Sequence, residues 1–317
     1  MQENMSNRRE FLQVSLAAAA AAALAKSASG ATTATAPATT TAHAATAPAT
    51  AAAAGPGQLR RASDVIELGP SKVKITRMAV GTGTYGAGKS SNQLRQLGAQ
   101  GVADMLLYAY ENGVTTWDTS DGYGTHAAVK IALKKVPRDK VTIVTKTPDY
   151  SAANLKPDLD RFLVEMDTDY IDIVLLHSRV RADLDTLDKP MMDVLFEAKQ
   201  KKVVRSYGIS VHSLEAMQTA AKSTWLEIAM CRINPTGTRM DATPEKVLPL
   251  VKALKDAGKG IIAIKVLGEG SLVDSLDEAL LYALNKSPAH CFSIGCESKE
   301  EFKQNFDRIA KLSQQKA

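Results

Sequence analysis

The sequence predicts an α/β fold, a (β/α)8 TIM barrel of parallel strands, preceded by a short N-terminal β-hairpin and a disordered signal and linker region. Strand-like and helix-like segments alternate eight times between residues 77 and 314. The strand-like segments are nearly continuous apolar runs rich in Val and Ile, as in parallel strands buried on both faces. The helix-like segments carry apolar residues at three- and four-residue spacing, as Val247, Val251 and Leu254 do. Eight such units in one domain predict a closed barrel.

Length, charge and cysteine content narrow the class of protein. The chain has 317 residues, 45% of them apolar, which is enough for one large core. The formal net charge is +5, from 39 basic and 34 acidic residues without an arginine-rich stripe, so we expect no nucleic-acid partner. The three cysteines, Cys231, Cys291 and Cys296, show neither a disulfide framework nor metal-ligand spacing. We expect them to be core residues, and we expect no metal.

The first 57 residues are predicted to lie outside the fold. Residues 1–25 combine paired Arg8 and Arg9 with a short apolar run and a small-x-small end, and resemble a bacterial twin-arginine (Tat) export signal. This predicts recognition by the Tat machinery and a periplasmic or otherwise exported protein; an uncleaved amphipathic tail is the alternative. The run is too short to span a bilayer, and no other run is apolar enough. Residues 26–57, mostly Ala, Thr and Pro, predict a disordered linker, and residues 58–317 the barrel.

The elements follow in order. Two strand-like segments, 64–69 and 72–76, meet at a Gly-Pro turn and predict the hairpin. The strand and helix of each later unit are expected at 77–86 and 92–113, 114–120 and 125–136, 140–148 and 155–166, 170–178 and 189–202, 204–213 and 214–223, 226–235 and 243–258, 260–270 and 271–286, and 290–298 and 299–314. An open doubly wound sheet would require a glycine fingerprint after the first strand, and residues 81–88 fit that pattern poorly.

A barrel carries its chemistry at the carboxyl ends of its strands. The residues expected there are, in chain order, Gly81, Thr82, Gly83, Thr84 and Tyr85, then Asp118 and Tyr123, then Lys146, His177, Ser210 and Asn234, and finally Lys265, Leu267, Gly268 and Gly270. Four of the titratable side chains among them would face one opening.

Those four, Asp118, Tyr123, Lys146 and His177, suit carbonyl reduction. A free tyrosine has a pKa of about 10. We expect a neighbouring lysine to lower that pKa and an aspartate to hold the lysine charged. A histidine could orient a carbonyl oxygen. Together they would supply a proton to an oxygen that becomes an alkoxide.

The segments that carry these residues resemble the aldo-keto reductases. The resemblance lies in WDTSDGYG at 117–124, IVTKT at 143–147 and DYIDIVLLHS at 169–178, and it runs from about residue 77 to the last helix. It implies that Tyr123 is the general acid, that Lys146 and Asp118 tune it, and that His177 orients the substrate. It also implies a small-molecule carbonyl substrate and hydride transfer from NADPH or, less often, NADH.

The resemblance is weaker in the expected cofactor contacts. The positions in question are His126, Lys130, Val211, Met230 and Ile264, where the family more often has Glu, Gly, Asn, Gln and Tyr. The remaining expected contacts come from the glycine loop 81–84, from Ser210 and Asn234, and from the segment 265–270, whose lysine and glycines could approach a pyrophosphate.

Two further cofactor contacts, Glu301 and Asn305, are expected on the last helix. NADP-binding members carry a Lys-Ser pair and a later Arg in this region, where this chain has Gly295, Cys296 and Glu301. A carboxylate there favours NADH, since it repels a 2′-phosphate and accepts from a 2′-hydroxyl, although Lys299 or Lys303 could offset it. Ser298 and Glu301 also fit a capping box.

Three functions therefore remain open. The first is an exported NAD(P)H-dependent carbonyl reductase that converts aldehydes or ketones to alcohols. The second is a barrel that binds the nicotinamide cofactor without turnover, as a redox-sensing or regulatory module, which the altered nicotinamide contacts would suit. The third is an enzyme that uses Lys146 to form an imine.

Overall fold

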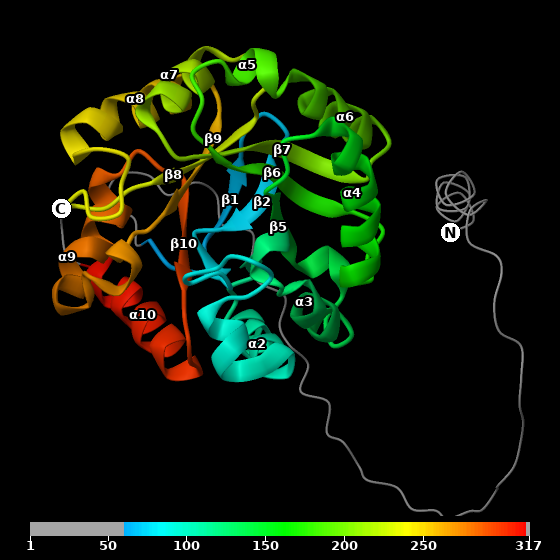
Figure 1. Cartoon of the computed structure of the whole chain (residues 1–317). Helices are drawn as coiled ribbons and strands as arrows, with labels where there is room; N and C mark the ends of the chain where they lie inside the picture. Colours follow the sequence, from blue (N-terminus) through cyan, green and yellow to red (C-terminus); the bar gives the residue numbers. More distant parts are fainter. Residues whose placement is uncertain (1–59, 315–317) are drawn as a thin grey trace, which may run out of the picture. The chain divides into compact units, whose positions relative to one another are not determined.

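The computed structural model of the chain describes residues 60–314 (Figure 1). The predicted export signal at 1–25 and the predicted linker at 26–57 lie outside this range, as do residues 58 and 59 and the last three residues. Among the described residues, every helix is too short or too polar to cross a lipid bilayer.

Eight parallel strands close into a barrel, which confirms the predicted fold class. Their order around the barrel follows the chain, with the last strand pairing with the first. The strands are β3 (Met78–Gly81), β4 (Thr116–Asp118), β5 (Thr142–Thr147), β6 (Ile171–Arg179), β7 (Val204–Val211), β8 (Ile228–Arg232), β9 (Gly260–Ile264) and β10 (Cys291–Gly295). Nearly all strand residues are buried, because the strands face side chains inside the barrel and helices outside it.

Helices surround the barrel, as Figure 1 shows. They are α2 (Asn92–Glu111), α3 (His126–Leu133), α4 (Ala152–Met166), α5 (Leu184–Leu187), α6 (Lys189–Gln200), α7 (Leu214–Lys222), α8 (Pro244–Asp256), α9 (Leu276–Leu281) and α10 (Lys299–Leu312). Val247, Val251 and Leu254 are fully buried, so the apolar stripe predicted for α8 faces the barrel.

The predicted hairpin, β1 (Val65–Leu68) and β2 (Val73–Thr76), is antiparallel and closes the amino-terminal end of the barrel. Leu68 and Ile75 pack with inward-facing side chains of the barrel strands. Gly69 lies where an added Cβ would come within 2.9 Å of the Glu227 carbonyl oxygen, next to the start of β8. The opposite end of the barrel remains the end where a site can form.

Helix α2 is less regular than its apolar spacing predicts. Its chain bends at Gly98, which has φ 64° and ψ 176°, so two helical segments meet there. An added Cβ at Gly98 would meet nothing within 4 Å, so the backbone angle alone favours glycine.

Candidate active site

The loop after β4 brings the aspartate and the tyrosine of the predicted site together. Asp118 is the last residue of β4, and Tyr123 ends a short 3-10 turn, Asp121–Tyr123. Ser120 caps this turn by accepting a hydrogen bond from the Gly122 amide. The turn stops at Gly124, which has φ 70° and packs so closely on the Lys89 carbonyl that a Cβ would lie 2.1 Å away. The glycines therefore allow a tight return toward the barrel axis.

Lys146 is buried and its ammonium is held from two sides. It donates to the Asp118 carboxylate at 2.5 Å and to the backbone oxygen of Thr119 at 2.9 Å. The other carboxylate oxygen of Asp118 accepts from the Ser293 hydroxyl at 2.8 Å. The same ammonium lies 4.9 Å from the centre of the Tyr123 ring. A buried ammonium is tolerated only when it is paired and hydrogen-bonded, and both conditions hold here.

Burial keeps Tyr123 protonated. The net pKa of its hydroxyl is raised, whereas a lowered pKa was expected. Burial raises the pKa of the Tyr123 hydroxyl, and the Lys146 charge lowers it by less. Burial also lowers the pKa of Lys146, but Asp118 and Tyr123 together raise that pKa above its usual value. Lys146 thus lowers the tyrosine pKa as predicted, but burial outweighs this effect and the net pKa of Tyr123 is raised. The prediction that Asp118 keeps the ammonium charged agrees with the direction of the Lys146 pKa.

The glycines of the first loop make room for the tyrosine ring. An added Cβ at Gly83 would lie 2.2 Å from a Tyr123 ring carbon, and one at Gly86 would lie 2.4 Å away. The loop was expected to bind a cofactor through its backbone. Its glycines at these two positions also have a steric role, because they let the chain pass against the face of Tyr123.

His177 lies beside the tyrosine. The two rings meet edge to face with centroids 5.7 Å apart. Burial, followed by the Lys146 charge, lowers the pKa of His177 to about 2, so its imidazole is neutral. A second imidazole, His212, is 6.2 Å from His177, and burial lowers its pKa to about 3. The four predicted side chains thus come together at the carboxyl end of the barrel.

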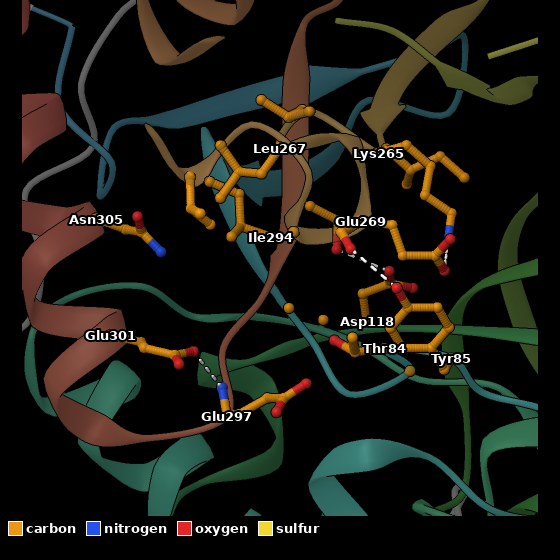
Figure 2. Close-up of a pocket in the computed structure, with 18 of the residues that line it drawn as sticks. Thr84, Tyr85, Asp118, Lys265, Leu267, Glu269, Ile294, Glu297, Glu301 and Asn305 are labelled. Carbon is orange, nitrogen blue, oxygen red and sulfur yellow. Dashed lines mark hydrogen bonds and ion pairs between the residues drawn. The ribbon is translucent and has the colours of Figure 1, made fainter. Parts of the chain in front are cut away.

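A pocket of about 590 Å³ opens at three of the four side chains, Asp118, Tyr123 and Lys146, and runs toward α10; His177 is not part of its lining. Figure 2 shows Asp118 and Thr84 on one side of it, Lys265 and Leu267 on another, and Glu301 and Asn305 at its far end. Of the expected cofactor contacts, those that line it are Gly81, Gly83, Thr84, Lys265, Leu267, Gly270, Glu301 and Asn305.

Four expected cofactor contacts are absent from the pocket wall. Thr82 and Ser210 are fully buried; Thr82 bonds to Thr125, and Ser210 lies 3.1 Å from His212. The Asn234 side chain is used in a turn, where it donates to two backbone oxygens and accepts from the Thr236 and Gly237 amides. Gly268 borders a separate hollow.

A contact between two distant loops lies at the pocket, and no pattern in the sequence predicts it. The Tyr85 hydroxyl donates to the backbone oxygen of Glu269 at 3.3 Å (Figure 2). The Glu269 carboxylate pairs with Lys265 at 2.5 Å and lies 3.5 Å from Arg239. Lys265, expected to face a pyrophosphate, therefore already has an anionic partner. All four residues have positive φ, which is uncommon outside glycine and concentrates strain at this opening.

Two carboxylates, Glu297 and Glu301, line the far end of the pocket, and Arg308, which also lines it, donates to Asp277. The Glu301 carboxylate accepts from the Glu297 amide at 2.8 Å, and the Glu301 amide donates to Ser298 at 3.1 Å (Figure 2). The expected capping box therefore forms with its second bond displaced by one residue. The Glu297 side chain, which the sequence did not single out, accepts from Asn92 and Gln96.

The pocket fits a nicotinamide dinucleotide in size and lining. Its volume falls within the range of about 300–1,000 Å³ common for cofactor and small-molecule sites. Its lining combines apolar side chains, among them Met230 and Ile264, with polar ones, among them Gln304 and Asn305. An apolar ring and a polar sugar would each find a matching surface.

Among the described residues, one cluster has side chains of the types that bind metals, and an arginine side chain already pairs with it. Asp121, His126 and Glu165 bring possible ligand atoms within 4.8 Å of one another. The Arg161 guanidinium donates to Asp121 and to Glu165, each at 2.7 Å. The three cysteines are buried, and burial raises the pKa of the Cys296 thiol to about 12.

Fold and site together define a class: a parallel (β/α)8-barrel enzyme with a buried tyrosine beside a lysine–aspartate pair at one end of a cofactor-sized pocket. Residues 77–316 match the aldo/keto reductase family, so the chain belongs to that family. Its members are NAD(P)-dependent oxidoreductases, which confirms the expected enzyme class and a nicotinamide cofactor.

Individual relatives are more distant. Methylglyoxal reductase DkgB of Escherichia coli O157:H7 is 32% identical over 130 residues, which are 40% of this chain and 48% of that protein. The chain thus matches about half the length of that relative. The NADH-specific methylglyoxal reductase of Escherichia coli K12 is 24% identical over 67% of this chain and 69% of its own. A Bombyx mori aldo-keto reductase solved with NADP superposes with a TM-score of 0.57 at 20% identity, over 79% of this chain and 92% of that one.

Proposed function

We propose that this chain reduces aldehyde or ketone carbonyls to alcohols with NADH or NADPH. The observation that carries the proposal is the protonated, buried Tyr123 next to the Lys146–Asp118 pair at one end of the pocket. The position of this pair explains why a lysine is tolerated in the barrel interior at all.

Tyr123 is the proton donor in this proposal. When bound, a nicotinamide would supply hydride to the carbonyl carbon, and negative charge would develop on the carbonyl oxygen. Tyr123 gives its proton to that oxygen, which leaves a phenolate next to the Lys146 ammonium. Because the ammonium is held by Asp118 before any reaction, its charge stabilises the phenolate with little reorganisation. The resting pKa of Tyr123 can therefore stay high without blocking the reaction.

His177 orients the substrate in this proposal, since its ring borders Tyr123. The names of the relatives suggest small carbonyl compounds such as methylglyoxal as first substrates to test. The apolar residues Met230 and Ile264, which line the pocket, would pack against the nicotinamide ring without bonding its amide.

That loss of polar contacts is the one observation in favour of a second candidate, a barrel that binds the cofactor for sensing or regulation. In that case the chain would bind NADH or NADPH stoichiometrically and show no turnover over a broad aldehyde panel. An imine-forming Lys146 has less support, because its ammonium is tied to Asp118 and its pKa is raised.

We also propose that the protein is exported by the twin-arginine route, which rests on Arg8, Arg9 and the apolar run that follows. Replacing both arginines by lysine should retain the protein in the cytoplasm, as cell fractionation would show. Equal export of the double variant and the parent would refute the proposal.

The activity is tested by following NADH and NADPH absorbance with methylglyoxal and a panel of aldehydes and ketones, using the full chain. Cofactor binding is measured on the same preparation by fluorescence titration. Turnover supports the reductase. Tight binding without turnover supports the sensing module, and the absence of both overturns the two proposals together.

A further inference from the structure

Ser120 has no role in the reaction as described so far, yet its hydroxyl lies at the centre of the site. The side chain is fully buried in the loop between Asp118 and Tyr123. Its hydroxyl donates to the backbone oxygen of Lys146 at 3.1 Å and accepts from the Gly122 amide at 3.3 Å. Its third neighbour is Nδ1 of His177, also at 3.3 Å.

The proton count at this hydroxyl links its orientation to the tautomer of the imidazole. A serine hydroxyl has one proton to donate and two lone pairs. The Lys146 carbonyl can only accept, and the Gly122 amide can only donate. All three contacts are therefore hydrogen bonds only if Nδ1 of His177 carries a proton and donates it to Ser120.

A proton on Nδ1 has a consequence for the other ring nitrogen. The imidazole of His177 is neutral, since burial lowers its pKa to about 2. A neutral imidazole has one N–H, so Nε2 must then be an acceptor. A carbonyl oxygen also accepts, and so it cannot bond to that nitrogen.

We propose that the Ser120 hydroxyl selects the tautomer of His177 and so decides which ligand oxygen the imidazole can bind; this inference rests on the proposed reductase function. When the Ser120 hydroxyl donates its hydrogen bond to the Lys146 carbonyl, Nε2 of His177 can accept a hydrogen bond from an alcohol. When the hydroxyl rotates to donate to Nδ1, Nε2 carries the proton and donates to a carbonyl. In this change of tautomer, Nδ1 releases its proton to water and Nε2 takes up a proton from water. Ser120 is thus a positioning residue that acts through His177.

The neighbouring His212 shows the contrasting case. Its Nδ1 faces the Arg232 guanidinium, which can only donate, so the His212 proton lies on Nε2. That proton is donated to the Ser210 hydroxyl at 3.1 Å. His212 has no alternative tautomer that keeps both bonds, so it provides an internal reference within the same site.

Two-bond proton–nitrogen NMR spectra of the ¹⁵N-labelled full chain test the assignment, because they distinguish the two tautomers of each ring. The chain has five histidines, and a His177→Gln variant identifies the signal of interest. Without ligand, we expect the Nδ1–H form at His177 and the Nε2–H form at His212. An Nε2–H form at His177 in the parent protein overturns the proposal, whether or not any variant folds.

Ser120→Ala removes the partner of Nδ1 and should convert His177 to the Nε2–H form. Thr125→Val is the matched control, because it removes an equally buried hydroxyl that bonds only to Thr82 and Thr119. The control should leave the His177 pattern unchanged. If Ser120→Ala keeps the parent pattern, Ser120 does not select the tautomer.

Kinetics supply a second readout. Ser120→Ala already has the carbonyl-binding tautomer, so carbonyl binding no longer includes the change of tautomer. With methylglyoxal as the probe, we expect KM to fall roughly fivefold, about the effect of one hydrogen bond, with kcat unchanged or lower. A rise in KM would contradict the proposal. The spectra need neither cofactor nor turnover, so failure of the reductase proposal would be recognised separately.

Discussion

At the scale of single residues, Tyr123, the proposed proton donor, is surrounded by groups of different chemistry. Lys146 faces the Tyr123 ring, His177 borders it edge to face, and Gly83 and Gly86 pack against its carbon atoms. Only the contact with Lys146 involves a charged group. The others fix where the hydroxyl lies, which proton transfer needs as much as a favourable pKa.

Removing the tyrosine oxygen should abolish most activity and little else. We expect Tyr123→Phe to lower kcat by about two to four orders of magnitude, the range for losing a general acid, and to leave NAD(P)H affinity intact. Lys146→Met should lower kcat similarly, and the double variant should be far from additive because both groups act on one proton. Retained turnover in Tyr123→Phe with unchanged cofactor binding would place the proton donor elsewhere.

The steric role of the glycine loop gives a second expectation. In Gly83→Ala the new Cβ would overlap the Tyr123 ring, which should lower the free energy of unfolding by about 1–3 kcal/mol and reduce kcat by displacing the hydroxyl. Gly122→Ala is the control, since the nearest atom to its Cβ is 3.8 Å away. Denaturant unfolding and steady-state kinetics measure both effects. If the two variants had the same free energy of unfolding and the same kcat, the overlap with the Tyr123 ring would have no measurable effect.

At the scale of elements, the start of α10 should set cofactor preference. Glu297 and Glu301 place two carboxylates at one end of the pocket, where a 2′-phosphate would be repelled. We expect tighter binding of NADH than NADPH. Glu301→Gln should narrow the difference, whereas Glu300→Gln, the same charge change off the pocket wall, should not. Dissociation constants at one ionic strength decide it. NADPH binding tenfold tighter than NADH, about 1.4 kcal/mol, would contradict this expectation.

The elements also show what the sequence could and could not predict. Buried strands and amphipathic helices leave a period in the chain, so the barrel and the four residues at its strand ends were predictable. The Tyr85–Glu269 contact joins residues 184 positions apart and has no local pattern. The direction of the Tyr123 pKa depends on burial, and the withdrawal of Asn234 into a turn depends on its loop geometry. Both follow from packing that only the folded chain displays.

At the scale of the whole molecule, buried neutral histidines should make the fold acid-sensitive. Burial lowers the pKa of His177 to about 2, of His212 to about 3 and of His290 to about 4. Below a pH of about 6.5 these histidines bind protons in the unfolded chain but stay neutral in the folded protein. Their stabilisation is complete above that pH and is lost as pH falls toward the folded pKa, by at most about 1.4 kcal/mol for each pH unit at His177 and His212 and by less at the more exposed His290.

Urea unfolding at pH 7 and pH 5 measures this loss. The free energy of unfolding should be lower at pH 5, and His290→Gln should reduce the difference, because it removes one such group outside the catalytic cluster. His290 accepts a hydrogen bond from the Ile261 amide through Nδ1, so it must stay neutral in the fold. A free energy of unfolding that is equal or higher at pH 5 would contradict the expectation.

The hairpin at the amino-terminal end affects how the reactants reach the site. The hairpin strands β1 and β2 pack with inward-facing side chains of the barrel, and the pocket lies at the opposite end, beside Asp118, Tyr123 and Lys146. In the proposed reaction hydride passes directly from the nicotinamide to the carbonyl carbon. We therefore expect cofactor and carbonyl compound to be bound in this pocket at the same time. Initial-rate plots at several fixed concentrations of the second reactant should give lines that intersect.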